Sequence, residues 1–434
     1  MQKIIKTTAC FLTCCSFLSL FPNAASADVT LSGTVRYWDS RTDRSDGVVI
    51  SNTGSRLTTV TQNTNRPARM VEIDVWDRDG SCIDFETTCF ETDDDFLAGV
   101  TTSITGYYQV DLGLGEDVYL VTDFTNDVGQ ARPNSATELV VFGREVTDIS
   151  FNTTYNWNIT CFDDSVNTTN GLCNNAASVG ANFSDAEDHA NMLATMHDTF
   201  NLVDSTNHTL NGHTNPINGY TNHASCSTPS SGTSWDYNSF CVGSDNIPRN
   251  HMVAHEIGHL IHRRALNYSG KLGYCQNGWD WPSHEGERCA TAEGWASFFA
   301  GAVYFTPSAL DPYFDVTDQV LEGDTTSANS GIVSDCVSDL NSPHRRPGNV
   351  ARFFWDILDS TTENEGSWSG DNSNESLIDI IAVWDDFESG TTNRKNNEDN
   401  YNGSHGRNAK DYEDYDSSTG IELNHNCLDN QDDG

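Results

Sequence analysis

The feature that most constrains this chain is a pair of histidines four residues apart, His255 and His259, with Glu256 directly after the first. Residues at this spacing lie on one face of an α-helix, so both imidazoles can reach the same metal ion. The apolar flanks at 252–254 and 260–261 predict that the helix is buried. Two neutral imidazoles suit Zn2+, and Glu256 is placed to handle a proton rather than to bind the metal. The alternative is a solvent-facing helix with two unrelated histidines.

A catalytic zinc site needs a third protein ligand and one position left open for water. His262 is on the same helix, but a third imidazole there is poorly aimed at a metal already held by the pair, so we expect it to pack or to line the rim. Ala265 stands where an extended motif would need a histidine. Glu293 is the better candidate, because a carboxylate within the apolar run 289–300 is costly unless it is paired or bound to metal. The alternative is an exposed acid in the first turn of a helix, where the helix dipole favours it.

The histidine motif, followed by a Glu-Gly-Trp run that starts at Glu293 and continues to Phe298, Phe299 and Ala300, resembles the gluzincin metallopeptidases. Within them it is most similar to the fungalysin-type secreted enzymes, over roughly residues 245–360. The resemblance implies that Glu293 is the third zinc ligand. This chain differs from the family at one position. The family usually has Asp four residues after this ligand, where it orients a zinc-bound histidine, whereas this chain has Ser297.

A second similarity to the fungalysin-type enzymes involves His344, which precedes a Gly-x-Val segment that leads to Trp355. In that family a histidine shortly before such a segment hydrogen-bonds the oxyanion of the tetrahedral intermediate, so the resemblance implies this role for His344. One extra residue separates His344 from Gly348 here. The alternative is an ordinary surface histidine in a basic turn.

The first 27 residues predict a cleavable secretory signal, with Lys3 and Lys6 before an apolar run and small residues at its end. No later apolar segment is long enough for a membrane span, so we expect a secreted, extracellular protein without one. Ten of the 13 cysteines lie beyond the signal. An even number in an exported chain favours disulfides over zinc ligation. Their spacing predicts the pairs Cys82–Cys89, Cys161–Cys173, Cys226–Cys241, Cys275–Cys289 and, by exclusion, Cys336–Cys427.

The chain is strongly acidic, with a net charge of −40 at pH 7 that becomes two units more negative when the signal's lysines leave. This charge argues against nucleic acid or an anionic membrane as a partner and leaves protein or peptide substrates. It also makes Ca2+ a second candidate cofactor beside Zn2+. The acidic loops at 93–95 and 429–434 offer oxygen ligands, although solvated charge runs are the commoner explanation.

Hydrophobic patterning predicts an α+β chain of several parts. Alternating segments at 30–37, 68–76, 97–110, 118–123 and 138–142 predict an N-terminal antiparallel β-sandwich over residues 28–145. Its segments 33–37 and 101–108 are weakly similar to transthyretin-like or carboxypeptidase-regulatory-like modules. Adhesion, substrate docking, assistance in folding and a spacer role remain open for it.

Residues 146–427 are expected to form a mainly helical zincin-type metallopeptidase domain, followed by an acidic tail at 428–434. Ser184 and Glu187 form a capping box, and apolar residues then recur at helical spacing from Leu193 to Val203. Further helices are expected near 348–359 and 376–388. A short strand near 240–242 is expected to border the substrate cleft.

These residues together predict a secreted zinc endopeptidase. Zinc held by His255, His259 and Glu293 would activate water, and Glu256 would serve as the general base. Two alternatives remain. One is an exopeptidase or a hydrolase of non-peptide bonds on the same scaffold. The other is a catalytically silent binding or adhesion protein, which the departure at Ser297 and the N-terminal module make conceivable.

Overall fold

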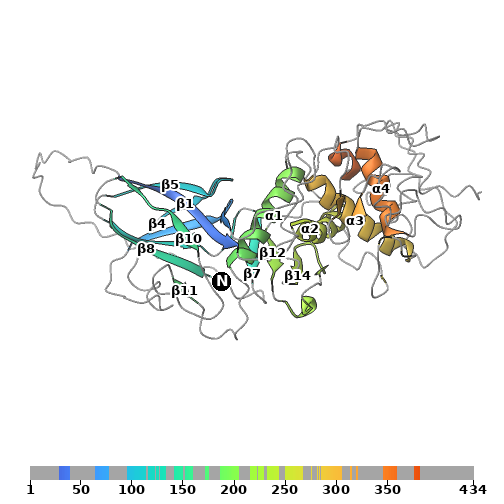
Figure 1. Ribbon diagram of the computed structural model, residues 1–434, viewed down its shortest axis with the longest axis horizontal. Coiled ribbons are helices and arrows are strands. Elements are labelled where there is room, and N and C mark those ends of the chain that lie inside the picture. Colours follow the sequence, from blue (N-terminus) through green and yellow to red (C-terminus); the bar gives the residue numbers. More distant parts are fainter. Residues whose placement is uncertain are drawn as a thin grey trace, which may run out of the picture.

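The structure is a computed structural model in which both helices and sheets are formed, as an α+β chain requires. It describes residues 29–39, 64–77, 95–132, 141–159, 172–174, 186–204, 216–243, 250–266, 275, 281, 283, 285–304, 313–314, 319–320, 346–358 and 376–381, apart from residues 114–115, 123, 127, 150–151, 222 and 229–231. Figure 1 shows the first strands gathered at one end of the molecule and the later helices at the other. None of the helices described is long and apolar enough to cross a membrane.

Two five-stranded sheets occupy the N-terminal end. In the first, β1 (Val29–Asp39) pairs antiparallel with β2 (Thr64–Pro67) and β5 (Tyr107–Leu112), and parallel with β9 (Thr153–Thr154) and β10 (Trp157–Ile159). The second has the order β11 (Leu172–Asn174), β8 (Val141–Ile149), β6 (Glu116–Thr122), β3 (Glu72–Asp77), β4 (Phe96–Thr101). In β5 every second residue is buried, which is the pattern of a strand with one face on a core.

The single strand expected over residues 97–110 is in fact two strands, β4 and β5, and they belong to different sheets. The chain turns between them, where the Ser103 amide and carbonyl bond Tyr107 and Gly106 and Gly106 has a φ of 73°. The buried Thr102 hydroxyl holds the start of this turn by donating to the Ala68 carbonyl and accepting from the Val71 amide. The alternation of apolar residues continues through the turn, so it does not reveal the break.

A third sheet lies between the two ends of the molecule and has the order β13 (Gly232–Ser234), β14 (Ser239–Val242), β12 (Ile217–Tyr220), β7 (Gly129–Arg132). The strand expected to border the cleft, near residues 240–242, is β14, which lies inside this sheet between β13 and β12. The strand at that edge of the sheet is β13. The short helix η2 (Ala224–Cys226) follows β12, and β15 (Tyr313–Phe314) and β16 (Gln319–Val320) form a separate two-stranded sheet later in the chain.

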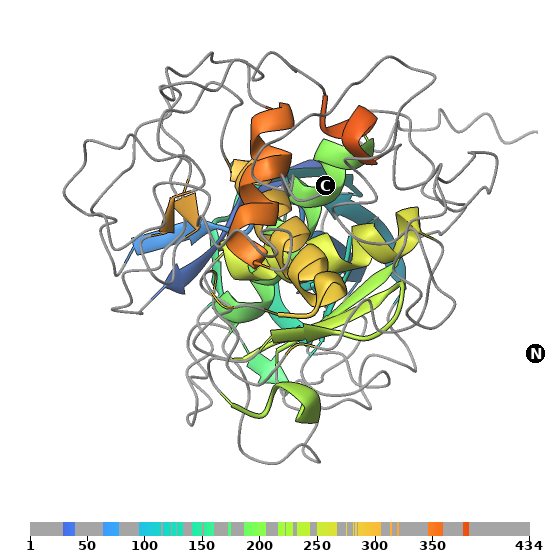
Figure 2. The ribbon, with the colours of Figure 1, turned by 90° about the vertical axis from the view of Figure 1, so that its right-hand side faces the viewer.

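Four helices of at least 12 residues are described: α1 (Ala186–Asp204), α2 (Asn250–Ala265), α3 (Glu287–Tyr304) and α4 (Pro347–Leu358). Leu193, Met196, Phe200 and Val203 of α1 are all buried, as their helical spacing predicts. The helix α3 packs against both α2 and α4. Figure 2, viewed from the helical end, shows α4 in front of these helices.

The packing around α3 depends on aromatic side chains and on one glycine. Trp295 is fully buried, its Nε1 donates to the Gly258 carbonyl of α2 at 3.0 Å, and its ring lies edge-on to Phe354 of α4. Gly294 faces α4 so closely that a Cβ built there would lie 2.6 Å from the Val350 Cβ and 2.6 Å from the Pro347 carbonyl oxygen. The glycine therefore lets α4 approach the helix that carries Glu293.

We expect Gly294→Ala to destabilise the protein by about 1–3 kcal/mol, because the added methyl group overpacks the contact between α3 and α4. This cost outweighs the gain in helix propensity of roughly 1 kcal/mol. Thermal unfolding measures the effect. The control is Gly99→Ala, where an added Cβ would meet nothing closer than 3.5 Å. Equal midpoints for the two variants would contradict this account of the contact.

Candidate metal centre

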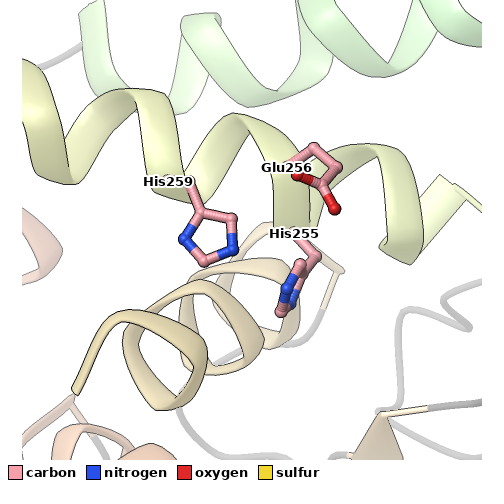
Figure 3. Close-up of side chains that lie close together, drawn as sticks. All are labelled: His255, Glu256 and His259. Carbon is pink, nitrogen blue, oxygen red and sulfur yellow. The ribbon is translucent and has the colours of Figure 1, made fainter. Parts of the chain in front are cut away.

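His255 and His259 lie one turn apart on α2, and Figure 3 shows the two rings on the same side of the helix. Their ring centroids are 4.8 Å apart and the rings are nearly perpendicular, at 86°. Both side chains are buried, with 4% and 10% of their surface exposed. The helix thus brings two imidazoles together in a site largely closed to bulk water.

Glu293 of α3 faces this pair of histidines. Its Oε2 lies 3.1 Å from the Nε2 of His255 and 3.4 Å from the Nε2 of His259. Two ligand atoms of one tetrahedral zinc, each about 2.0–2.1 Å from the metal, lie roughly 3.3 Å apart. The three residues singled out in the sequence as metal ligands are therefore close together, and the Glu293 oxygen lies from each imidazole nitrogen at a distance compatible with such a site.

Glu256 is also close to the pair, and its carboxylate completes a His255–Glu256–His259 group whose ligand atoms all lie within 4.8 Å of one another. Two acids thus compete for the place of third ligand. Glu293 is better placed, because a single oxygen of its carboxylate contacts both Nε2 atoms. Glu256 directly follows His255 on the same helix, and neighbouring residues of a helix do not face each other. The Glu256 Oε2 is buried and has no hydrogen-bond partner among the residues described. A group that can hold a metal ion is present, and Glu256 has an oxygen left for other chemistry.

The two carboxylates have pKa values shifted in opposite directions. Burial raises the pKa of Glu256 well above its usual value, the nearby charge of Glu293 adds to this, and Arg263 opposes it. Burial would also raise the pKa of Glu293, but the charge of His259 and the hydrogen bonds from His255 and His259 outweigh it and hold this pKa below its usual value. Burial lowers the pKa of His259, and the contact with Glu293 acts in the opposite direction.

Ser297, the residue that departs from the gluzincin pattern, lies behind the first histidine. Its Oγ is 3.4 Å from the Nδ1 of His255, and its side chain is fully buried. When Nε2 of His255 faces a metal, Nδ1 carries the proton and donates to this hydroxyl. Ser297 therefore occupies the orienting position with a neutral acceptor in place of a carboxylate.

Two residues near the site were not found from the sequence, one beside Glu256 and one beside Arg263. Gly232 of the edge strand β13 is so close that a Cβ there would lie 2.3 Å from the Glu256 Oε1. Ser234, two residues on, accepts a 2.7 Å hydrogen bond from Arg263, whose charge acts on Glu256. One glycine and one serine in a Ser- and Gly-rich stretch carry no signal of this contact, which arises from the packing of β13 on α2.

Two of the predicted disulfides are confirmed, Cys226–Cys241 and Cys275–Cys289. The first joins η2 to β14, and the second joins residue 275 to the first turn of α3. The other three predicted pairs involve residues outside those that the structure describes.

Other residues predicted for the site have different outcomes. His262 is buried and its ring packs on Trp295, with centroids 5.6 Å apart, as expected of a packing residue. His344 lies outside the described residues, so its role in oxyanion stabilisation stays a prediction. The same holds for the terminal acidic loop at 429–434 and for residues 93–94 of the other candidate calcium loop.

No protein-family model matches this chain, and no characterised protein matches it in sequence. Among solved structures, it is similar to a 9R-lipoxygenase from Cyanothece PCC8801, with 15% identity and a TM-score of 0.18. The match covers 44% of this chain and only 25% of the lipoxygenase. A likeness this weak carries no argument, so function must be inferred from the site itself.

We expect Ser297→Ala to weaken metal binding by about tenfold, because His255 loses the acceptor that fixes its tautomer and orientation. Competition with a chelator of known affinity measures the change. Ser103→Ala, which removes a hydroxyl in the turn between β4 and β5, is the control and should bind metal like the parent protein. Unaltered affinity in Ser297→Ala, with normal thermal unfolding, would show that the 3.4 Å contact does not orient the ring.

Proposed function

We propose that this chain is a secreted zinc endopeptidase of the gluzincin type, with His255, His259 and Glu293 as metal ligands. The observation that carries the proposal is the contact of one Glu293 oxygen with the Nε2 atoms of both histidines, at 3.1 and 3.4 Å. Two imidazoles and one carboxylate form the ligand set of many hydrolytic zinc sites, which leave a position for water. The donor set therefore fits Zn2+ better than Ca2+, which prefers six to eight oxygen ligands.

When bound, Zn2+ supplies Lewis acidity, which makes water more acidic and polarises a carbonyl group. The protein supplies the proton transfer through Glu256. Its Oε2 is buried, and no group in the described part of the chain hydrogen-bonds it, so it is available to accept a proton from the attacking water. Burial and the Glu293 charge raise the pKa of Glu256, which favours the protonated carboxyl that passes its proton to the leaving amine.

The edge strand β13 supports an extended peptide as the substrate. It is paired only on its β14 side among the strands described, and its Gly232 lies against Glu256. An extended chain that adds to such an edge forms main-chain hydrogen bonds along its length. Its backbone would then pass next to the general base, which is the geometry that cleavage of internal peptide bonds requires.

Export and the N-terminal module belong to the same proposal. The two disulfides described are compatible with an extracellular location, as is the acidic composition. We propose that the two N-terminal sheets pack as a β-sandwich before the peptidase domain. Buried residues from both sheets, such as Leu31 and Val35 of β1 and Ile73 and Val75 of β3, belong to one hydrophobic core that continues into the helices, and their burial is compatible with this packing.

Removal of the metal should abolish proteolysis. We expect the purified protein to cut casein at internal bonds, to lose this activity after dialysis against a chelator and to regain it with stoichiometric Zn2+ but not with Ca2+ alone. Fragment masses distinguish internal cleavage from stepwise trimming of the ends. Cleavage that persists in metal-free protein, verified by metal analysis, would overturn the proposal.

Replacement of the general base should separate catalysis from metal binding. We expect Glu256→Gln to lower kcat by about a hundredfold or more while zinc content stays at the parent level, because the amide cannot accept the proton. The matched control is Glu72→Gln, the same chemical change at an exposed position on β3, which should leave activity unchanged.

The same variant decides between the two candidate carboxylates. If Glu256→Gln lost its zinc, Glu256 would be a metal ligand and the assignment of Glu293 as the third ligand would be wrong. If Glu256→Gln kept both zinc and full activity, Glu256 would not be the base. The corresponding Glu293→Gln variant should lose metal affinity, which competition with a chelator detects.

A further inference from the structure

The Cys275–Cys289 disulfide lies directly against the proposed metal site. Cys289 is in the first turn of α3, four residues before Glu293, so the two side chains are on the same face of that helix. The Sγ of its partner, Cys275, lies 3.5 Å from the Glu293 Oε1. The other oxygen of this carboxylate contacts His255 and His259. One carboxylate thus has the histidine pair on one side and a cysteine sulfur on the other.

In the disulfide, this contact is not a hydrogen bond, because the sulfur has no proton to donate. Cysteine binds zinc as a thiolate, so a disulfide sulfur is not its usual metal-binding form. A free Cys275 would differ in both respects. Rotation between staggered rotamers moves a cysteine sulfur by about 3 Å, a displacement comparable with its present distance from the Glu293 carboxylate.

We propose that this disulfide is a redox switch and that reduction turns Cys275 into a fourth ligand of the metal held by His255, His259 and Glu293. This inference rests on the proposed zinc site. While the disulfide is intact, the fourth position is left for water and the enzyme is active. After reduction, the Cys275 thiolate occupies that position and the enzyme is inhibited.

The chemistry balances with an external dithiol as the reductant. One thiolate of the dithiol attacks the Cys275 sulfur, the S–S bond breaks, and Cys289 leaves as a thiolate that takes up a proton. The second thiol of the dithiol then attacks the mixed disulfide, which releases Cys275 and oxidises the dithiol to its own disulfide. Cys275 is released as a thiolate, the proton of the attacking thiol goes to solvent, and the thiolate would then bind the metal in place of water.

The environments of the two sulfurs decide which cysteine reacts and binds. Cys275 is partly exposed, so a reductant can reach it, whereas Cys289 is fully buried. The Cys289 Sγ lies 3.9 Å from the Oε2 of Glu285, a buried carboxylate that is not among the proposed metal ligands. Once reduced, Cys289 can stay at this position as a buried thiol, while Cys275 is the sulfur next to the metal ligand.

Two single variants test the switch as a matched pair, because each lacks the disulfide but each keeps a different thiol. Cys289→Ser leaves Cys275 free, and Cys275→Ser leaves Cys289 free. After loading with Co2+ in place of zinc, we expect thiolate-to-cobalt charge-transfer absorption in Cys289→Ser and none in Cys275→Ser. Cys289→Ser should also lose most of its peptidase activity and release metal to a chelator more slowly than Cys275→Ser.

Several outcomes would overturn the switch. If the disulfide only stabilises the fold, both variants should lose activity equally and neither should show charge-transfer absorption. Cobalt binding without that absorption in Cys289→Ser would remove the switch but leave the proposed metal site intact. If the oxidised parent protein bound no cobalt, the proposed function and the switch would fail together.

The parent protein gives a second measurement that does not depend on the folding of a variant. Cobalt-loaded oxidised protein is treated with a phosphine reductant, which cleaves disulfides without adding a competing thiol. We expect the charge-transfer absorption to appear on reduction and to disappear on reoxidation. Reduction of the Cys275–Cys289 bond, verified by mass spectrometry, without any change in the spectrum would refute the proposal.

Discussion

The structure of the candidate site depends on the contact between the Glu293 carboxylate and two imidazoles across the interface of α2 and α3. A carboxylate among apolar aromatic residues is costly unless charges or hydrogen bonds compensate it, and here the two rings do so. The contact requires that α2 and α3 stay at a fixed distance. A 3.0 Å hydrogen bond from the Trp295 Nε1 to the Gly258 carbonyl helps to hold them there. Helix packing and metal-site geometry are therefore one constraint, since a shift of α3 would separate Glu293 from both histidines.

The same packing gives two neighbouring glutamates different chemistry. Glu293 receives hydrogen bonds from both histidines and stays ionised, which suits a metal ligand. Glu256 lies against the strand β13, where burial raises its pKa and the nearby Glu293 charge adds to this; among the residues described, none hydrogen-bonds its Oε2. In the proposed site, two acids with oppositely shifted pKa values would divide the roles of ligand and base. The division follows from which carboxylate faces the rings and does not require different residue types.

The sequence predicted the site further than it predicted the fold around it. Spacing placed His255, Glu256 and His259 on one buried helix, and the cost of an isolated carboxylate singled out Glu293, although 34 residues separate it from His259. The contact of Gly232 with Glu256 had no signal, because it arises where distant segments pack. The break between β4 and β5 was also missed, since the apolar alternation runs through a turn held by the Thr102 hydroxyl. Local periodicity thus identifies which face of a helix or strand is buried. Tertiary contacts decide where a strand ends and which residues surround a side chain such as Glu256.

The third sheet ties the metal site to the N-terminal strands. Its edge strand β13 lies against Glu256, while its opposite edge, β7, comes from the chain segment that follows β6 of the N-terminal sheets. β7 pairs in parallel with β12 over four residues, and Arg132 Nε donates to the Asn218 side chain at 3.0 Å. A further link, the Arg69–Asp198 ion pair, joins the N-terminal strands to α1 at 3.1 Å. The sheet beneath α2 is therefore completed by residues from the N-terminal half, so the N-terminal strands are part of the scaffold that holds Glu256, and separating them from the helices would expose the β7 side of β12.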